Sequence, residues 1–465
     1  MSLLKGWNNI ARGLGELRSS ARVRASAVNA VSGIADYVAQ PVSMLLAAPF
    51  LLRHMGLSQF GLWMLVSAAV SSSSTFTTGF GDAAVKYVSG ARGESDWPEV
   101  ASVVRGAITI NLALGLLMGM LLWLAAPYVV HHVFKIEEGF HRLAIEALRI
   151  GSLILVVRSV ESVPVSTLRA FEQYLPSVRI NAVSRCAIIL ITVLLVAKGG
   201  GVTGIMLATF VVSSMAMLLQ ARALRKYVGP VRLLPSIDGN WLPKIARFGS
   251  FSWLQAFSAL AFSQADRLII GALLGTTGVA YYSVCTQAAQ PIHGISSAGL
   301  HFLFPHLSAR HARETAVELR RVVGFAFRLN LLLVIALLLP VALFARPILE
   351  FWMGAEFAHA AGTTLSVLAV AFALLAVNIT AHYTMLALGQ IRYLTCLNLS
   401  AGVATALLML VLVSHWGITG AAAARLLYGP VTWVLYLKVR NALSDGSAGS
   451  AHTAPELAVA VEDVG

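Results

Sequence analysis

The sequence has little charge, few acidic residues and little cysteine for its length. Charged residues make up 12% of the 465 residues and hydrophobic residues 57%, whereas a soluble domain carries about 25% charged residues. This shortage of charge excludes a soluble globular fold. The three cysteines, Cys186, Cys285 and Cys396, lie inside apolar stretches without paired spacing. They therefore indicate neither a disulfide framework nor a metal site.

Long polar connections are scarce as well. On one side of the predicted membrane the longest connections, near 131–142 and 346–362, are short and leave no room for an external catalytic domain. No nucleophile–base pair, metal-ligand cluster or phosphate-binding loop stands out in the sequence. We therefore expect a protein that is not an enzyme and that uses no cofactor.

The sequence consists instead of a series of long apolar stretches. A helix needs about 20 apolar residues to cross the hydrocarbon core of a bilayer. Stretches of this kind lie near 27–51, 57–80, 105–130, 143–167, 178–197, 201–221, 248–273, 278–304, 322–345, 363–388, 393–414 and 417–438. They predict an all-α polytopic membrane protein with about 12 transmembrane helices.

The spacing of these stretches predicts two six-helix lobes. We expect an N-lobe at 25–221 and a C-lobe at 248–440, joined by a cytoplasmic linker at 222–247 in which prolines and glycines stand among basic residues. Residues 1–24 place apolar side chains at helical spacing beside basic ones, which predicts a helix in the membrane surface, with a soluble tail as the alternative. Residues 441–465 have the composition of a disordered tail.

Lysine and arginine gather on alternate connections between the apolar stretches. One set of connections includes Arg92, Arg169, Arg225, Arg321 and Lys438, and the other has only Arg53, Lys135, Arg142, Lys198 and Arg346. Basic residues near span ends are retained in the cytoplasm, so this bias predicts that both termini are cytoplasmic. The net charge of +13 is then a signal for orientation and for anionic lipid, and we expect no nucleic-acid partner.

The two predicted halves resemble each other when the chain is shifted by about 219 positions, which places Gly56 on Gly275 and Gly61 on Ala280. The shift superposes two polar stripes in the second and eighth spans, each on one helix face. The stripes are Ser67, Ser71, Ser74, Thr78 and Asp82 in the first half and Thr286, Gln290, His293, Ser297 and His301 in the second. Unsatisfied polar groups in hydrocarbon cost several kcal/mol each, so we expect both stripes, with Gln287, to line a water-filled interior. The alternative is that they bond neighbouring helices, at about 0.6 kcal/mol apiece.

Several ionisable residues lie inside the predicted spans, where a charge costs at least about 2.5 kcal/mol. They are Asp36, Arg158, Glu161, Arg185, Asp266, Arg267 and Arg425. If the fourth and fifth spans turn near Tyr174, Glu161 and Arg185 lie at similar depth and can pair. Arg158 is then a surplus cation that an anionic ligand could neutralise. The alternative is that Glu161 forks between both arginines, since buried charges are usually paired.

Two carboxylates remain. Asp266 and Arg267 are adjacent, so on a helix they point about 100° apart and each is expected to find another partner. Asp36 is the carboxylate near the centre of the first span. Desolvation disfavours its charged form, so it could exchange a proton or bind a cation during transport. An internal hydrogen bond that keeps Asp36 neutral is the alternative.

Four stretches carry a family resemblance. SQADRLIIGALLGTTGVAYYSV at 263–284 resembles the seventh-span signature of bacterial polysaccharide flippases, and LRHMGLSQFGLWML at 52–65 followed by TGFGDAAVKYVSG at 78–90 resembles its partner in the first half. ALGQIRYLTCLNLSAG at 387–402 and HWGITGAAAARLLYG at 415–429 are similar to the eleventh and twelfth spans. These flippases belong to the multidrug/oligosaccharidyl-lipid/polysaccharide exporter superfamily.

The resemblance implies a two-lobe transporter of the bacterial inner membrane that alternately opens to either side. Its substrate would be a polyprenyl-pyrophosphate-linked oligosaccharide, its coupling ion a proton or sodium, and its possible partner a polysaccharide polymerase. Substrate-binding residues are then predicted at Arg158, Arg185, Arg267, Gln287, Gln290 and His293, and ion-coupling residues at Asp36 and Glu161. A first-span carboxylate is typical of drug exporters, so a multidrug exporter is the alternative, followed by a polysaccharide polymerase or ligase.

Overall fold

The computed structural model describes residues 21–228, 235, 264–301, 303–311 and 316–444. The side chains of 21–42, 75–84, 86, 305, 309–311, 316 and 442–444 lie outside this description. All regular elements in these residues are helical. Several predicted segments fall largely outside the described residues: residues 1–20 of the surface helix predicted at 1–24, most of the linker, the first part of the seventh span, and residues 445–465 of the tail predicted at 441–465. The predictions for the other segments are compared with the structure below.

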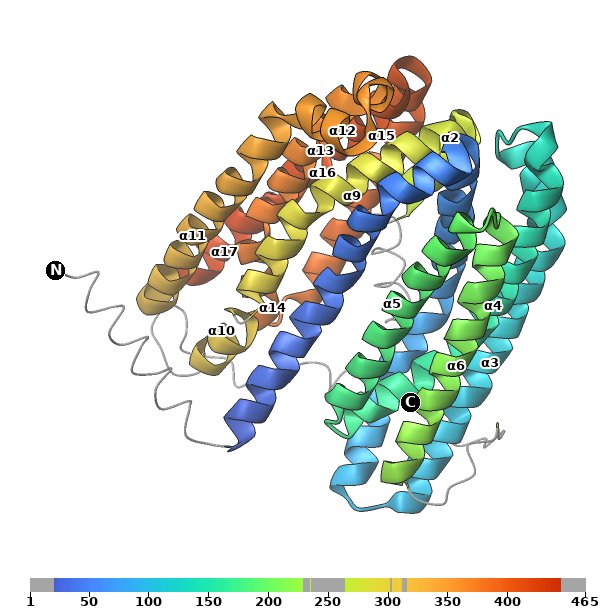
Figure 1. The fold of residues 1–465 in the computed structure, drawn as a ribbon. Helices are drawn as coiled ribbons and strands as arrows, with labels where there is room; N and C mark the ends of the chain where they lie inside the picture. Colours follow the sequence, from blue (N-terminus) through green and yellow to red (C-terminus); the bar gives the residue numbers. More distant parts are fainter. Residues whose placement is uncertain (1–20, 229–234, 236–263, 302, 312–315, 445–465) are drawn as a thin grey trace.

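A first group of helices precedes the linker and lies on the right in Figure 1. Its members are α2 (Ala21–Gly93), α3 (Trp97–Tyr128), α4 (His141–Ala170), α5 (Tyr174–Ala197) and α6 (Val202–Val228). α3 begins where the Asp96 side chain accepts a hydrogen bond from the backbone N–H of Glu99 at 2.9 Å, with Pro98 in the first turn. α6 runs seven residues into the predicted linker, because its apolar face continues to Val228.

A second group follows the linker and lies on the left in Figure 1. Its members are α8 (Ala265–Leu273), α9 (Gly275–Leu300), α10 (Leu303–His311), α11 (Ala316–Leu343), α12 (Ala345–Met353), α13 (Ala355–Val377), α14 (Ile379–Ala387), α15 (Ile391–Arg425), α16 (Tyr428–Thr432) and α17 (Val434–Ser444). Among the described helices, the main contacts between the groups run from α2 to α8 and α9. The exact lobe boundaries stay a prediction.

Two long helices change direction at glycines. α2 departs from helical geometry at Gly56 (φ 77°, ψ 166°) and α15 at Gly417 (φ 56°, ψ −137°). Both backbone angles lie in a region that favours glycine. The breaks fall where the sequence separates the first span from the second and the eleventh from the twelfth.

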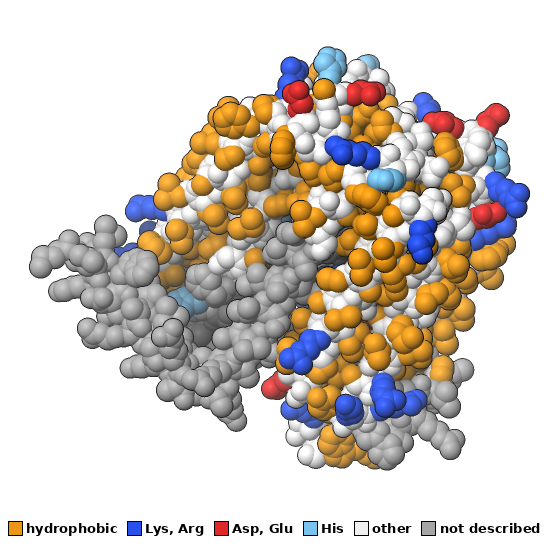
Figure 2. Space-filling view, in the orientation of Figure 1, with side chains coloured by type: hydrophobic (Ala, Val, Ile, Leu, Met, Phe, Trp, Pro, Cys, Tyr) orange, Lys and Arg blue, Asp and Glu red, His pale blue; other side chains and the backbone are white. Residues whose placement is uncertain are grey.

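The described helices carry apolar side chains on their outer faces. α3 exposes Leu116, Met120 and Leu124 in one row, whereas Gly115 and Gly119 are buried against α4. Small residues at a helix contact and large apolar ones outside are typical of helices packed in lipid. Figure 2 shows the resulting apolar band between two more polar ends.

Seven helical segments among the described residues are long and apolar enough to cross a membrane. One of them, Ile391–Asn441, has 51 residues and contains the bend at Gly417. The structure thus confirms an all-helical, multi-pass membrane fold, and the count of about 12 spans stays a prediction.

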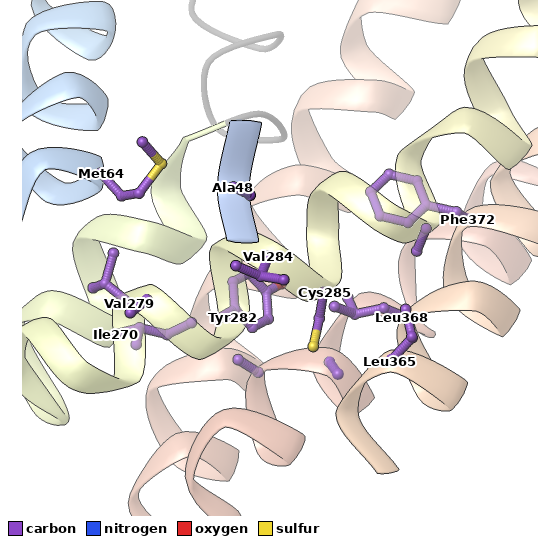
Figure 3. Close-up of a cluster of buried hydrophobic side chains, with 14 of the residues drawn as sticks. Ala48, Met64, Ile270, Val279, Tyr282, Val284, Cys285, Leu365, Leu368 and Phe372 are labelled. Carbon is purple, nitrogen blue, oxygen red and sulfur yellow. The ribbon is translucent and has the colours of Figure 1, made fainter. Parts of the chain in front are cut away.

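The main apolar core joins the two groups. Figure 3 shows side chains of this core from four helices. They are Ala48 and Met64 of α2, Ile270 of α8, Val279, Tyr282, Val284 and Cys285 of α9, and, on the right, Leu365, Leu368 and Phe372 of α13. A second cluster around Val103, Val163 and Leu224 belongs to the first group alone. The groups therefore share a core near the bend at Gly56.

Candidate functional site

Three charged residues of the first group lie close together. Arg158 and Glu161 stand one turn apart on α4, and Arg185 lies on the adjacent α5. All three are partly buried, and each arginine acts electrostatically on Glu161. The depth argument paired Glu161 with Arg185 and left Arg158 as a surplus cation, whereas in the structure Glu161 lies within the field of both arginines, as in the alternative. The cluster holds two cations and one anion among the described side chains.

Neutral polar residues extend this cluster into the helix group. The Ser162 hydroxyl donates to Asn111 Oδ1 at 3.3 Å, and the Gln220 amide donates to Asn181 Oδ1 at 3.2 Å. Asn111 and Gln220 are fully buried. A buried amide is stable only with hydrogen-bond partners, so these contacts make the interior of the first group polar.

The second group contains an ion pair that the sequence did not reveal. Arg425 Nη2 of α15 lies 3.1 Å from Asp266 Oδ2 of α8, with side chains 6% and 3% exposed. The guanidinium also stands over the Phe372 ring, 5.0 Å from its centroid. The expectation that Asp266 finds a partner other than Arg267 is consistent with this pair. Helical periodicity could not identify Arg425 as the partner of Asp266, because the two residues are far apart in the chain.

Arg267 lies beside that pair and is partly buried. Its backbone N–H donates to Asp266 Oδ1 at 2.8 Å, and its Nη1 donates to Gln264 Oε1 at 3.2 Å. Asp266 and Arg425 also act electrostatically on its guanidinium. This second cluster again holds two arginines and one carboxylate among the described side chains.

A cavity of about 10 Å³ adjoins the Asp266–Arg425 pair. Thr405 and Tyr428 also line it, and the Thr405 hydroxyl has no hydrogen-bond partner among the described residues. The volume fits about one water molecule. This cavity is too small for any substrate.

Polar residues along α9 contact two different helices, α2 and α14. Gln287 is 8% exposed and its amide lies 3.7 Å from Met64 Sδ of α2. Ser297, farther along, shares a 3.0 Å hydrogen bond with the Tyr383 hydroxyl of α14, which matches the helix-bonding alternative for that residue. Gln290 and His293 between them are partly buried. Their role as cavity-lining residues stays a prediction.

The α2 stripe and Asp36 are described only in part. The Ser73 and Ser74 hydroxyls donate to backbone oxygens of their own helix, a common use of serine in apolar helices. The side chains of Asp36, Thr78 and Asp82 lie outside the described residues. The ion-coupling role of Asp36 therefore stays a prediction.

Sequence reasoning overlooked one cation in a described span. Arg149 of α4 stands over the Trp123 ring of α3, 5.3 Å from its centroid. Its position inside the fourth predicted span could have identified it. Across the described residues there is no group of three or more His, Cys, Asp or Glu side chains suited to a metal ion.

The geometry of the described residues is thus a multi-pass helical bundle with buried charges in both helix groups. Residues 50–362 match the family described as "Polysaccharide biosynthesis protein". The chain belongs to this family, as its sequence motifs predicted. No protein of curated function matches the sequence.

Solved structures show the same fold. An inward-facing multidrug resistance MATE family transporter of the MOP superfamily is 17% identical, with a TM-score of 0.74 over 90% of this chain and 100% of that one. The lipid II flippase MurJ, in an inward closed conformation, is 13% identical, with a TM-score of 0.70 over 89% and 87%. A MOP superfamily transporter from Pyrococcus furiosus is 15% identical, with a TM-score of 0.62 over 93% and 98%. The chain is therefore a member of the polysaccharide biosynthesis protein family, and it has the fold of these MOP superfamily structures.

Proposed function

We propose that the protein flips a polyprenyl-pyrophosphate-linked oligosaccharide across the bacterial inner membrane during surface polysaccharide biosynthesis. The observation that carries the proposal is the charge of the two clusters, each with two arginines and one carboxylate. These are Arg158, Arg185 and Glu161 in the first group and Arg267, Arg425 and Asp266 in the second. Guanidinium groups in an apolar interior favour an anionic ligand, and a pyrophosphate is such a ligand.

The arginines would bind the pyrophosphate while neighbouring polar residues surround the sugars. A guanidinium forms strong, charge-assisted hydrogen bonds to phosphate oxygens, and these gain strength away from water. Arg158, Arg185 and Arg267 are the proposed phosphate ligands. Gln287, Gln290 and His293 on α9 are the proposed sugar contacts, because amide and imidazole groups can both donate and accept.

Transport would proceed by alternating access, with both termini in the cytoplasm and about 12 spans in two lobes. A proton or sodium gradient would drive the change, with Asp36 and Glu161 as the coupling carboxylates. Protonation or cation binding at Glu161 would alter the charge of the first cluster, since Glu161 lies within the field of both arginines. Binding and conformational change require no bond to be broken, so we propose no enzymatic activity.

A multidrug exporter is the second candidate, and the similarity in fold to MATE transporters supports it. Exporters of cationic drugs need carboxylates to attract their substrates, because unlike charges stabilise one another in low dielectric. The described clusters contain more arginines than carboxylates. This excess supports the anionic, lipid-linked substrate.

Complementation tests the proposal. A bacterium that lacks its own polysaccharide flippase and carries the matching biosynthetic enzymes should regain surface polysaccharide when this chain is expressed. The same cells are tested for survival in cationic antimicrobial compounds. Drug resistance without polysaccharide export, at normal membrane levels of the protein, would support the exporter and contradict the flippase.

A further inference from the structure

The two helix groups meet along a line of three glycines. A Cβ atom at Gly61 of α2 would lie 1.8 Å from the backbone oxygen of Thr276, and one at Gly275 would lie 2.5 Å from that of Lys135. A Cβ at Gly271 would lie 2.4 Å from Leu65 Cδ1. Real Cβ atoms do not approach other atoms so closely, so the two backbone contacts, at Gly61 and Gly275, depend on the missing side chain, whereas the Leu65 side chain at Gly271 is able to move. We call these contacts the glycine seam.

Backbone atoms join the seam at one end. The N–H of Lys135, between α3 and α4, donates to the Gly271 oxygen of α8 at 3.0 Å. The same connection is anchored in the first group, because the Ser58 hydroxyl donates to Glu137 Oε1 at 2.8 Å. The connection is thus held by one group and bonded to the other.

The seam lies where the two repeats coincide. Gly61 and Ala280 are equivalent positions of the two halves, and a Cβ at Gly61 would lie 3.2 Å from the Ala280 nitrogen. Gly56 and Gly275 are also equivalent, and both have positive φ angles, 77° and 82°. Equivalent positions can touch only near the axis that relates the halves. The seam therefore lies on the approximate twofold axis of the molecule.

The groups also touch along the first part of α2, where the Trp352 indole N–H of α12 donates to the Leu45 oxygen at 3.2 Å, but at the far ends of α2 and α9 the following contacts lie within one group. Near the other end of α2, Val88 and Ala91 pack with α3 and α4 in the core of the first group alone. Near the other end of α9, Ser297 bonds to Tyr383 of the second group. Few basic residues stand near the seam in the sequence, and many stand at the far ends, which assigns the seam to the outer side of the membrane.

We propose that the glycine seam is the outer closure of the transporter and that its backbone contacts determine how much of the protein is closed to the outside. A side chain added at Gly61 or Gly275 would meet a backbone oxygen of the other group and hold the two groups apart. The inference rests on the alternating access proposed above. It adds the contact that must open, and its first test requires no substrate.

Thiol labelling tests the closure. Thr276 is 3% exposed in the seam, so a Thr276→Cys variant, in a chain with Cys186, Cys285 and Cys396 replaced, should react slowly with an impermeant thiol reagent added outside. Gly61→Ala should accelerate this reaction by on the order of tenfold or more, which corresponds to about 1.4 kcal/mol. Gly204→Ala on α6 is the control, since a Cβ there meets nothing within 4 Å. An unchanged labelling rate in folded Gly61→Ala protein would overturn the proposal.

A cross-link that holds the seam closed is a second test of the proposal. Lys135 and Ala272 line one open pocket of about 560 Å³ beside the seam and belong to different helix groups. Joining cysteines at these two positions with a short cleavable reagent should stop polysaccharide export, and cleavage should restore it. Continued export by fully cross-linked protein would overturn the proposal. Faster labelling in Gly61→Ala without any polysaccharide export by the native chain would uphold the seam and remove the flippase alone.

Discussion

Arg158 and Arg267 are the residues on which the proposed chemistry depends most, since each lies in a buried cluster with more cation than anion. If they bind pyrophosphate, transport should depend more on the positive charge of the side chain than on its shape. Arg→Lys at either position should retain part of the transport, and Arg→Gln should reduce it by at least about tenfold, the equivalent of one lost charge-assisted contact. Complementation of polysaccharide export, beside a measurement of membrane protein levels, checks this.

Glu161→Gln is the control for these variants. It removes the carboxylate and leaves both arginines cationic, so membrane levels should stay normal. If the cluster is only structural, Glu161→Gln should harm folding as much as either arginine change, because breaking a buried pair costs about 3–5 kcal/mol. Full polysaccharide export by both Arg158→Gln and Arg267→Gln would remove these two arginines from the mechanism.

Burial should determine how much the Asp266–Arg425 pair contributes to the free energy of unfolding. Arg425→Met leaves Asp266 as an uncompensated buried charge and should destabilise the protein by about 3–5 kcal/mol, whereas Asp266→Asn together with Arg425→Met should recover most of that loss. Arg142→Met is the matched control, since Arg142 lies 3.1 Å from Glu146 but is 93% exposed, and such pairs contribute about 0–1 kcal/mol. Thermal unfolding in detergent measures all three. Equal losses for Arg425→Met and Arg142→Met would refute the argument.

Some of these residues could be predicted from the sequence and others could not. Glu161 and Arg185 flank one turn, so counting residues from Tyr174 places these two at similar depth, with Arg158 one helical turn away from Glu161. Arg425 reaches Asp266 only because α15 packs on α8. Helical periodicity gives the face on which each lies but not which faces meet.

At the scale of the helices, glycines mark the breaks that the sequence predicted. Gly56 and Gly417 stand between apolar stretches long enough for two crossings, so hydropathy alone located both. The short helices α12, α14 and α16 were not predicted. The break between α13 and α14 occurs at Asn378 inside a continuous apolar stretch. Hydropathy does not register a change of direction within apolar sequence.

Gly417→Ala tests whether the bend is a property of the backbone. A Cβ at Gly417 has open space, with Leu274 Cδ1 as its nearest atom at 4.0 Å, so any loss must come from the φ of 56°. We expect a destabilisation of about 1–3 kcal/mol. Gly324→Ala within α11 also has open space and ordinary helical geometry, and it should stabilise by about 0.5–1 kcal/mol. Similar unfolding temperatures for the two variants would contradict this.

At the scale of the whole molecule, the distribution of basic residues predicts the orientation. Gly139 lies in the connection between α3 and α4, and Gly93 lies at the end of α2. Both are exposed, and a Cβ meets nothing at either position. Cysteine at Gly139 should react with an impermeant reagent from outside, and cysteine at Gly93 should react only after the membrane is opened. The reverse pattern would invert the orientation and with it the outer position of the seam.

The fold and family of the molecule followed from its sequence more readily than its packing did. Charge depletion and span length indicate a helical membrane protein, and four motifs indicate the family, which the family match confirms. The repeat also placed Gly56 on Gly275, and the two glycines share a positive φ. The glycine seam could not be predicted, because sequence spacing does not show which repeat-related helices touch across the axis.

Reconstituted transport tests the central claim most directly. Purified protein in liposomes is given a fluorescent polyprenyl-pyrophosphate-linked oligosaccharide in one leaflet, with a proton or sodium gradient, and arrival in the other leaflet is measured by quenching. Native protein should accelerate this movement. Arg158→Gln and Arg267→Gln should not accelerate it, although both variants are folded in detergent. Movement of a cationic drug but not of the lipid-linked sugar, under either gradient, would contradict the account.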